Sequence, residues 1–207
     1  MIKAVIFDVD GVLIDSFEAN LKFFSDLMGH FGHRSPTREE FPALFPRPMK
    51  EIIKTLSKSN DEEVEKIWVA GKDGHVPYPH ELLSGPENIE EIIKKLSEKY
   101  VLAVVTSRTK ENVFKSPQMK KIESYFKLAI TYQDTENHKP HPEPLLLATE
   151  KLALLPEECV YVGDAESDVV AAKAAGMKSV IYSESSLAGA DANILYFHDL
   201  ENILTNL

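Results

Sequence analysis

The chain has 207 residues, a formal net charge of −10 at pH 7 and 43% hydrophobic residues. The acidic surplus argues against a nucleic acid or an anionic membrane surface as partner, and no run of about 18 apolar residues predicts a transmembrane helix. Its single cysteine, Cys159, excludes an internal disulfide framework and is typical of a reducing cytoplasm, where we expect the protein to reside.

The first predicted strand, Ile2–Val9, ends in two acidic residues, Asp8 and Asp10, followed directly by Gly11. Aspartate has low strand propensity, and two like charges at a strand end repel each other. The same arrangement suits chemistry in which a cation sits there, one carboxylate acts as nucleophile and its neighbour moves protons. We therefore interpret this strand end as the centre of a site rather than as a strand ending in solvent.

Residues 16–84 have helical spacing without a convincing strand, and we expect them to form an inserted helical domain. Its predicted helices are Phe17–Phe31, Met49–Lys58 and Asp61–Lys72. Residues 1–15 and 85–207 are expected to form the core domain, with the chain returning near Gly85.

Beyond residue 85, short runs rich in valine and isoleucine alternate with helical patterns. Further strands are predicted at Val101–Ser107, Leu128–Tyr132, Cys159–Gly163 and Ser179–Tyr182, with a weaker one at Asn193–Phe197. Helices are predicted at Asn88–Lys99, Pro142–Leu152 and Ser167–Ala175, with Pro142 and Pro144 in a first turn and Gly176 as a C-cap. This alternation predicts an α/β fold, a doubly wound parallel sheet with helices on both faces.

Polar groups follow several of these strands, where ligands bind in such sheets. Besides the first strand, the second ends in Thr106, the loop after the third carries Lys139, and the fourth leads into Asp164 and Asp168. Taken singly, each has an ordinary alternative as a strand residue, a surface lysine, or a turn and helix cap. Their order along the chain favours one shared site.

A phosphate ester gives each of these groups a role, because phosphoryl transfer depends mainly on positioning and charge neutralisation. A carboxylate nucleophile would split hydrolysis into two steps through an acyl phosphate. Asp8, Asp164 and a carbonyl oxygen are hard ligands that favour Mg²⁺, while Lys139 would bring a positive charge and Thr106 a hydroxyl to the phosphoryl group. Four carboxylates against one lysine leave a formal charge of −3, which a divalent cation would reduce to −1.

The chain resembles the phosphatase branch of the haloacid dehalogenase superfamily over nearly its whole length. Four motifs carry the resemblance, in order: Asp8-Val9-Asp10-Gly11-Val12, Val104-Val105-Thr106-Ser107, Lys139-Pro140-His141-Pro142 and Val162-Gly163-Asp164-Ala165-Glu166-Ser167-Asp168. The resemblance implies a Rossmann-like core, and the insert resembles the small α-helical cap of phosphoglycolate phosphatases and β-phosphoglucomutases.

The resemblance also implies residue roles. Asp8 would be the nucleophile and a Mg²⁺ ligand, and Asp10 would move protons while its carbonyl ligates the metal. Asp164 would ligate Mg²⁺, with Asp168 supporting it directly or through water. Thr106 and Lys139 would hold the phosphoryl group, and substrate contacts are also expected at Gly11 and Ser107. The insert departs from the family's usual glycine before its substrate-facing helix, and there Arg47 and Lys50 are our own candidates for contact with an anionic substrate. Dehalogenases of the superfamily lack the second aspartate, so Asp10 argues against dehalogenation.

The leading hypothesis is a cytoplasmic Mg²⁺-dependent phosphatase acting on a small phosphorylated metabolite. A phosphomutase of the β-phosphoglucomutase type differs only in that a sugar hydroxyl, rather than water, receives the phosphoryl group. A signalling module that accepts a phosphoryl group on aspartate is the alternative from another class. Asp10 and the helical insert oppose it, since proton transfer and a lid that excludes water both favour turnover.

Overall fold

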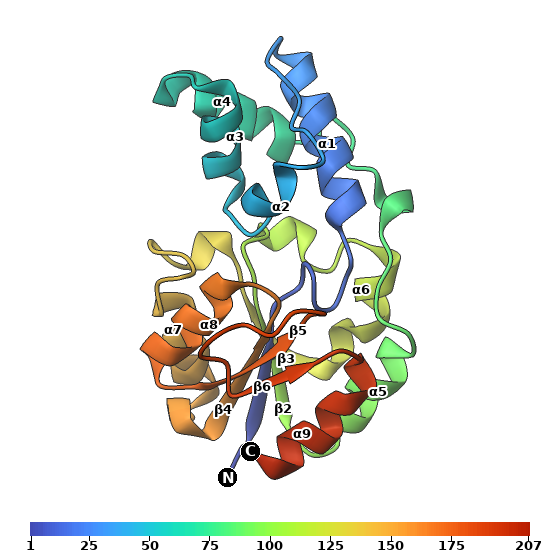
Figure 1. Ribbon diagram of the computed structural model, residues 1–207, viewed down its shortest axis with the longest axis vertical. Coiled ribbons are helices and arrows are strands. Elements are labelled where there is room, and N and C mark those ends of the chain that lie inside the picture. The colour runs from blue at the N-terminus through green and yellow to red at the C-terminus, as the bar shows by residue number, and fades with distance from the viewer. The chain divides into compact units, whose positions relative to one another are not determined.

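The computed structural model describes residues 1–207, which form two compact units (Figure 1). The sheet unit comprises Met1–Asp15 and Ser84–Leu207, and the helical unit comprises Ser16–Leu83. The chain leaves the sheet unit once, after its first strand. Where it returns, the backbones of Asp15 and Ser84 exchange two hydrogen bonds, with N···O distances of 3.0 and 3.1 Å.

The sheet unit is built on six parallel strands in the order β3-β2-β1-β4-β5-β6. Their bounds are β1 Ala4–Phe7, β2 Val101–Val105, β3 Phe126–Ile130, β4 Cys159–Gly163, β5 Lys178–Tyr182 and β6 Ala192–Ile194. Strand order reverses at β1, which has β2 on one side and β4 on the other. In open α/β sheets, ligands bind at such a switch point, beyond the carboxyl ends of the strands.

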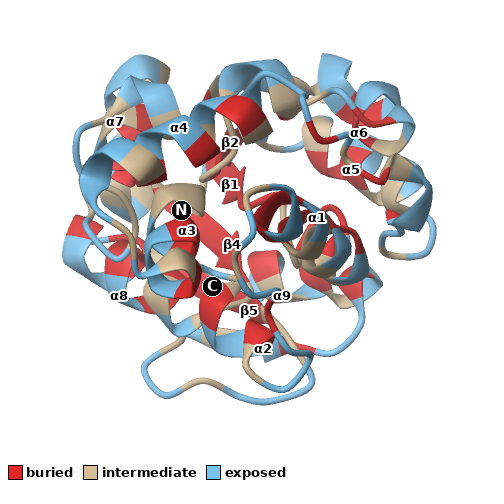
Figure 2. Cartoon of the chain, turned by 90° about the horizontal axis from the view of Figure 1, so that it is seen from above, coloured by how far each residue is buried: buried red, intermediate tan, exposed pale blue.

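Helices cover both faces of this sheet (Figure 1). Helices α7 (Glu143–Leu152) and α8 (Glu166–Ala175) pack on the face that carries Ile6 and Tyr161. The other face is covered by α5 (Ile89–Ser97), α6 (Pro117–Ile122) and α9 (Leu200–Asn206). Strands β1 and β4 are buried throughout and β2 is buried after its first residue, whereas the helices expose their outer faces (Figure 2). The polar residues that follow β1, β2 and β4 are therefore held by buried strands.

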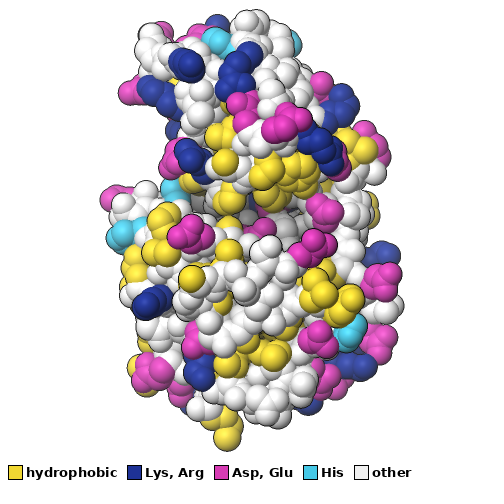
Figure 3. All heavy atoms as spheres, viewed as in Figure 1, with side chains coloured by type: hydrophobic (Ala, Val, Ile, Leu, Met, Phe, Trp, Pro, Cys, Tyr) yellow, Lys and Arg dark blue, Asp and Glu magenta, His cyan; other side chains and the backbone are white.

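The helical unit has its own apolar core, in which phenylalanines are prominent. It contains α1 Phe17–His30, α2 Phe41–Leu44, α3 Met49–Ser57 and α4 Asp61–Lys72, and no strand. Acidic and basic side chains are interspersed over the face of the molecule shown in Figure 3, as expected for solvated surface charge. None of the helices is both long and apolar enough to cross a membrane.

The predicted α/β fold with a doubly wound parallel sheet is confirmed, but several element bounds were wrong. Strand β3 was predicted at Leu128–Tyr132 and occupies Phe126–Ile130 instead. It ends early because Thr131 caps a 3-10 turn, in which its N–H and hydroxyl both donate to the Asp134 carboxylate. Helices α2, α6 and α9 were not predicted, since each is only four to seven residues long and shows too little periodicity.

Candidate active site

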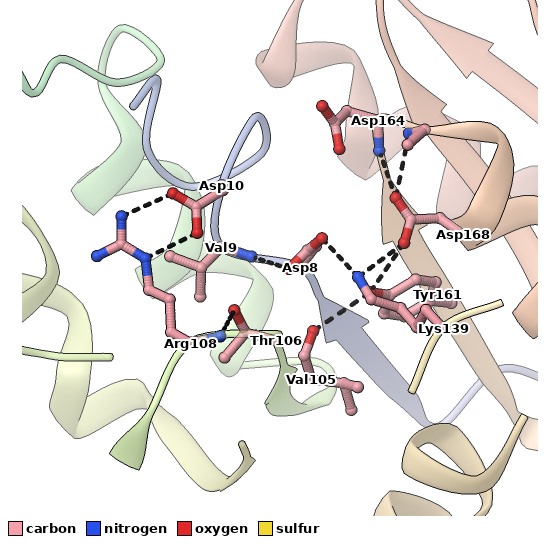
Figure 4. A network of polar contacts seen from close by, with 11 residues as sticks. Asp8, Val9, Asp10, Val105, Thr106, Arg108, Lys139, Tyr161, Asp164 and Asp168 are labelled. Carbon is pink, nitrogen blue, oxygen red and sulfur yellow. Dashed lines mark hydrogen bonds and ion pairs between the residues drawn. The ribbon is translucent and has the colours of Figure 1, made fainter. Parts of the chain in front are cut away.

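The ends of β1, β2 and β4 bring the first, second and fourth motifs to one edge of the sheet (Figure 4). Asp8 directly follows β1 and continues its ladder, because its N–H donates to the carbonyl of Val162 at 2.9 Å. Thr106 directly follows β2, and Asp164 directly follows β4. Parallel strands end at the same edge, so residues distant in sequence become neighbours.

Lys139 connects this edge to the loop after β3. Its ammonium nitrogen lies 2.6 Å from Asp8 Oδ2, 2.7 Å from Asp168 Oδ1 and 2.8 Å from the hydroxyl of Tyr161. These acceptors match the three N–H donors of an ammonium group. Burial alone would lower the pKa of Lys139, but the charges of Asp168 and Asp8 raise that pKa well above its ordinary value. Lys139 is therefore a buried, fully charged cation.

The loop that carries Lys139 is restrained by contacts of the residues that precede the lysine. The His138 ring stacks on Tyr132, with ring centroids 4.1 Å apart. The Glu143 carboxylate accepts hydrogen bonds from the backbone N–H groups of Glu136 and Asn137, at 3.0 and 3.1 Å. These contacts hold the backbone just before the lysine against Tyr132 and against the first residue of α7, so the lysine side chain starts from a defined position.

Asp168 and Asp164 differ in the hydrogen bonds that their carboxylates accept. Asp168 Oδ2 accepts the N–H groups of Asp164 and Ala165, each at 3.1 Å, while its Oδ1 faces Lys139. The Asp164 carboxylate accepts no hydrogen bond, and burial followed by the charges of Asp168 and Asp8 raises its pKa to about 8. Asp168 therefore stabilises the turn after β4, whereas the Asp164 carboxylate oxygens are available to a ligand such as a cation.

These carboxylates fit a divalent cation. One oxygen from each of Asp8, Asp164 and Asp168 lies within 4.8 Å of the others. Burial raises the pKa of Asp8 to about 6, with Asp168 adding to the rise and Lys139 opposing it. Hard oxygen ligands in such a cluster suit Mg²⁺, whose charge would offset the repulsion. Both oxygens of Asp8 and both oxygens of Asp168 already accept hydrogen bonds, so Asp164 is the carboxylate of the three with oxygens left for a cation.

Two motif glycines make room for this cluster. Gly11 has a φ of +80°, and a Cβ on it would lie 2.0 Å from Asp164 Oδ2. A Cβ on Gly163 would lie 2.4 Å from the Cβ of Asp168. The sequence predicted a substrate contact for Gly11. Its geometry shows a steric requirement, because only glycine allows the first and fourth motifs to approach this closely.

Asp10 is held by a residue to which the sequence analysis gave no role. Arg108 donates from Nε to Asp10 Oδ2 at 2.7 Å and from Nη2 to Oδ1 at 2.6 Å. The backbone N–H of Arg108 also donates to Thr106 Oγ1 at 3.2 Å, and Ser107 between them is partly exposed. With Arg108 included, four carboxylates and two cations leave a formal charge of −2, which one divalent ion would neutralise.

Arg47 and Lys50 belong to the helical unit, where they contact its own residues. Arg47 Nε donates to the carbonyl of Ala43 at 3.2 Å. The Lys50 ammonium lies 2.7 Å from the Glu65 carboxylate and 4.1 Å from the centre of the Trp68 ring. These contacts give both residues a structural role, and their predicted contact with the substrate stays a prediction.

Sequence reasoning missed two residues of the network, Arg108 and Tyr161. Arg108 was visible as a cation directly after Thr106 and Ser107, at a strand end that already carried polar groups. Tyr161 was visible as the one residue with a hydroxyl in the apolar strand that leads to Asp164. Each was a polar residue in or directly after an apolar strand, which is the signal that could have identified it. The residue that each one contacts lies far away in the sequence.

Comparisons with known proteins agree with this geometry. A family model described as haloacid dehalogenase-like hydrolase matches residues 5–182. Pyrophosphatase PpaX of Anoxybacillus flavithermus is 31% identical over 180 residues, which is 86% of this chain and 82% of the relative. A haloacid dehalogenase-superfamily hydrolase of subfamily IA from Geobacter sulfurreducens is 31% identical, with a TM-score of 0.72 over 98% of this chain and 96% of the other. CbbY of Rhodobacter sphaeroides, solved with phosphate, shares the fold at 24% identity, with a TM-score of 0.83 over 97% and 96% of the two chains.

Proposed function

Because the chain belongs to the haloacid dehalogenase-like hydrolase family, we propose that it is a Mg²⁺-dependent phosphatase that hydrolyses a small phosphorylated metabolite through an aspartyl phosphate on Asp8. The observation that carries the proposal is the contact between the Lys139 ammonium and the Asp8 carboxylate at 2.6 Å, beside Asp164, whose carboxylate accepts no hydrogen bond. On this proposal, the nucleophile Asp8, the phosphate-binding Lys139 and the metal ligand Asp164 act together at one edge of the sheet.

Mg²⁺ would be held by Asp8, Asp164 and the backbone carbonyl of Asp10, with Asp168 supporting them. When bound, it supplies the positive charge that allows an anionic carboxylate to approach an anionic phosphate. The residues present fit this ion, because they provide hard oxygens and a net negative charge.

In the first step, an oxygen of Asp8 attacks the phosphorus and the bond to the leaving oxygen breaks. The Val9 N–H, 2.7 Å from Asp8 Oδ1, and Lys139 near Oδ2 hold the carboxylate for this attack. Asp10 donates a proton to the leaving oxygen, which requires at least one of its oxygens to turn away from Arg108. Thr106 and Lys139 hold the phosphoryl oxygens, and Ser107 lies at the same strand end.

In the second step, Asp10 takes a proton from a water molecule as that water attacks the phosphorus. The bond between phosphorus and Asp8 breaks, its electron pair returns to the carboxylate, and inorganic phosphate leaves. The helical unit would serve as the cap that selects the substrate and excludes competing water. Arg47 and Lys50 are the candidate substrate contacts in it.

The test is phosphate release from a panel of small phosphorylated compounds, with and without Mg²⁺. The panel contains pyrophosphate, 2-phosphoglycolate, a hexose 1-phosphate and an aryl phosphate, since relatives include proteins named as pyrophosphatase and phosphoglycolate phosphatase. Asp8→Asn should lower kcat at least about 10³-fold with every active substrate, because the nucleophile is lost. Asp199→Asn, which alters an exposed carboxylate of the same unit, is the control.

Activity of Asp8→Asn near that of the wild type would refute the assignment of the nucleophile. Conversion of the hexose 1-phosphate into its 6-phosphate without net phosphate release would instead indicate the phosphomutase. An aspartyl phosphate that persists for hours in the native protein would indicate the signalling module.

A further inference from the structure

Tyr161 is a fully buried residue of β4 with its hydroxyl inside the charged network (Figure 4). The hydroxyl oxygen lies 2.8 Å from the Lys139 ammonium, 3.2 Å from the Val105 carbonyl oxygen and 3.4 Å from Asp168 Oδ1. The proposed reaction steps do not use this group. The role of this buried hydroxyl, which contacts the proposed phosphate-binding lysine, is therefore still to be explained.

The side chain of Tyr161 spans the sheet from β4 to β2. The register pairs Tyr161 with Ile6 of β1, and β1 lies between β4 and β2. The Val105 carbonyl that the hydroxyl reaches belongs to the last residue of β2, immediately before Thr106. The hydroxyl thus connects, across β1, the strand that leads to Asp164 with the strand that leads to Thr106.

The direction of the hydrogen bonds is set by the donors and acceptors available. An ammonium group has only donors, so the Tyr161 oxygen accepts from Lys139 and keeps its own proton to donate. The carbonyl of Val105 is the nearer acceptor for that proton, at 3.2 Å against 3.4 Å for Asp168. The result is a directed chain from Lys139 through Tyr161 to the backbone of β2.

Lys139 depends on such a partner because a lysine side chain is flexible. Asp8 and Asp168 each accept one of its N–H groups, and the hydroxyl of Tyr161 provides the third acceptor. Asp168 is itself fixed by two backbone N–H groups, whereas Asp8 would be consumed as nucleophile. Tyr161 and Asp168 are therefore the two contacts that would persist while Asp8 carries a phosphoryl group.

We propose that Tyr161 is a positioning residue, whose hydroxyl holds the Lys139 ammonium against the phosphoryl group throughout both steps. The inference rests on the proposed function, since it requires Lys139 to bind the phosphoryl group. It predicts that loss of the Tyr161 hydroxyl lowers both the reaction rate and the affinity for phosphate, and that neither value changes when Lys139 is absent.

The test begins with Tyr161→Phe, which removes the hydroxyl and keeps the ring. We expect kcat/KM for the best substrate to fall about 10- to 100-fold, as a displacement on the order of 1 Å does at a reacting centre. The inhibition constant of inorganic phosphate should rise at least several-fold. Tyr182→Phe, whose ring packs on Phe197 in the same unit, is the matched control and should leave both values unchanged.

A double-mutant cycle with Lys139→Ala separates positioning from a general structural effect. In the Lys139→Ala background, Tyr161→Phe should lower residual activity by less than about twofold. Equal losses in both backgrounds, or wild-type activity and phosphate affinity of Tyr161→Phe, would overturn the inference. Wild-type activity of Lys139→Ala would instead contradict the proposed function.

If Tyr161→Phe fails to fold, as judged by circular dichroism, 3-fluorotyrosine at position 161 replaces it. Fluorine weakens the hydroxyl as an acceptor while keeping the ring and the O–H group. A loss of kcat/KM that disappears in the Lys139→Ala background supports the inference, and an unchanged kcat/KM contradicts it.

Discussion

Asp164→Asn should stabilise the metal-free protein at neutral pH while it abolishes the response to Mg²⁺. The carboxylate of Asp164 accepts no hydrogen bond, so replacing it with an asparagine amide removes no hydrogen bond. Burial and the charges of Asp168 and Asp8 raise its pKa from 3.8 to about 8. The folded protein thus binds this proton more tightly than the unfolded chain does, and ionisation of Asp164 opposes folding.

Linkage gives the sign and size of the effect. A raised carboxyl pKa means that wild-type stability falls as pH increases from about 4 to about 8, the interval between the unfolded and the folded pKa. Each pKa unit corresponds to about 1.4 kcal/mol. Between about pH 5 and pH 7.5 the wild type should lose at least about 1 and up to about 3 kcal/mol relative to Asp164→Asn.

Urea unfolding in the presence of a chelator measures this difference at the two pH values. Addition of Mg²⁺ at 100 times its Kd should then stabilise the wild type by about 2.7 kcal/mol and the variant far less. Asp199→Asn, at the exposed control position, should show neither effect. A stability difference between Asp164→Asn and wild type that is the same at both pH values would refute the reasoning.

Two further substitutions test the geometry around the first motif. Gly11→Ala should weaken Mg²⁺ binding by at least about tenfold and destabilise the protein by about 1–3 kcal/mol, because its Cβ meets Asp164 at a φ of +80°. Gly74→Ala has a similar φ of +77° with nothing near its Cβ, so it controls for backbone strain, and equal Mg²⁺ affinity in both variants would contradict the steric argument. Arg108→Gln should lower kcat about tenfold or more with a smaller change in KM, since Asp10 loses both charged hydrogen bonds, and Arg108→Lys should recover part of the loss. An Arg108→Gln variant with unchanged kcat and an unchanged pH profile would show that Asp10 needs no such partner.

Local sequence patterns were sufficient to predict that the strands exist and which polar residues follow β1, β2 and β4, although the bounds of β3 were wrong. The apolar run Cys159–Gly163 was predicted with its observed bounds, and Asp8, Thr106 and Asp164 lie at strand ends as expected. These predictions succeed because a buried parallel strand must be apolar along its length, so a polar residue directly after it marks the ligand-binding edge.

The contacts that complete the network could not be predicted in this way. Arg108 turns back to Asp10, which lies 98 positions earlier in the sequence, and Tyr161 reaches Val105 across an intervening strand. The order of strands in the sheet determines which distant residues come into contact. Hydrophobic periodicity along the sequence does not reveal that order. The sequence also could not decide whether Asp168 binds the metal directly or only supports it. The two backbone N–H groups that donate to its carboxylate come together only in the folded turn.

The central claim is that Asp8 carries the phosphoryl group. The most direct measurement is mass spectrometry of the acid-quenched Asp10→Asn variant after incubation with Mg²⁺ and the best substrate, because loss of Asp10 should slow hydrolysis of the intermediate. We predict that the peptide containing Asp8 gains the mass of one phosphoryl group, and that the variant lacking both Asp8 and Asp10 gains none. A phosphoryl group on another residue, or on neither protein while phosphate is still released, would contradict the account.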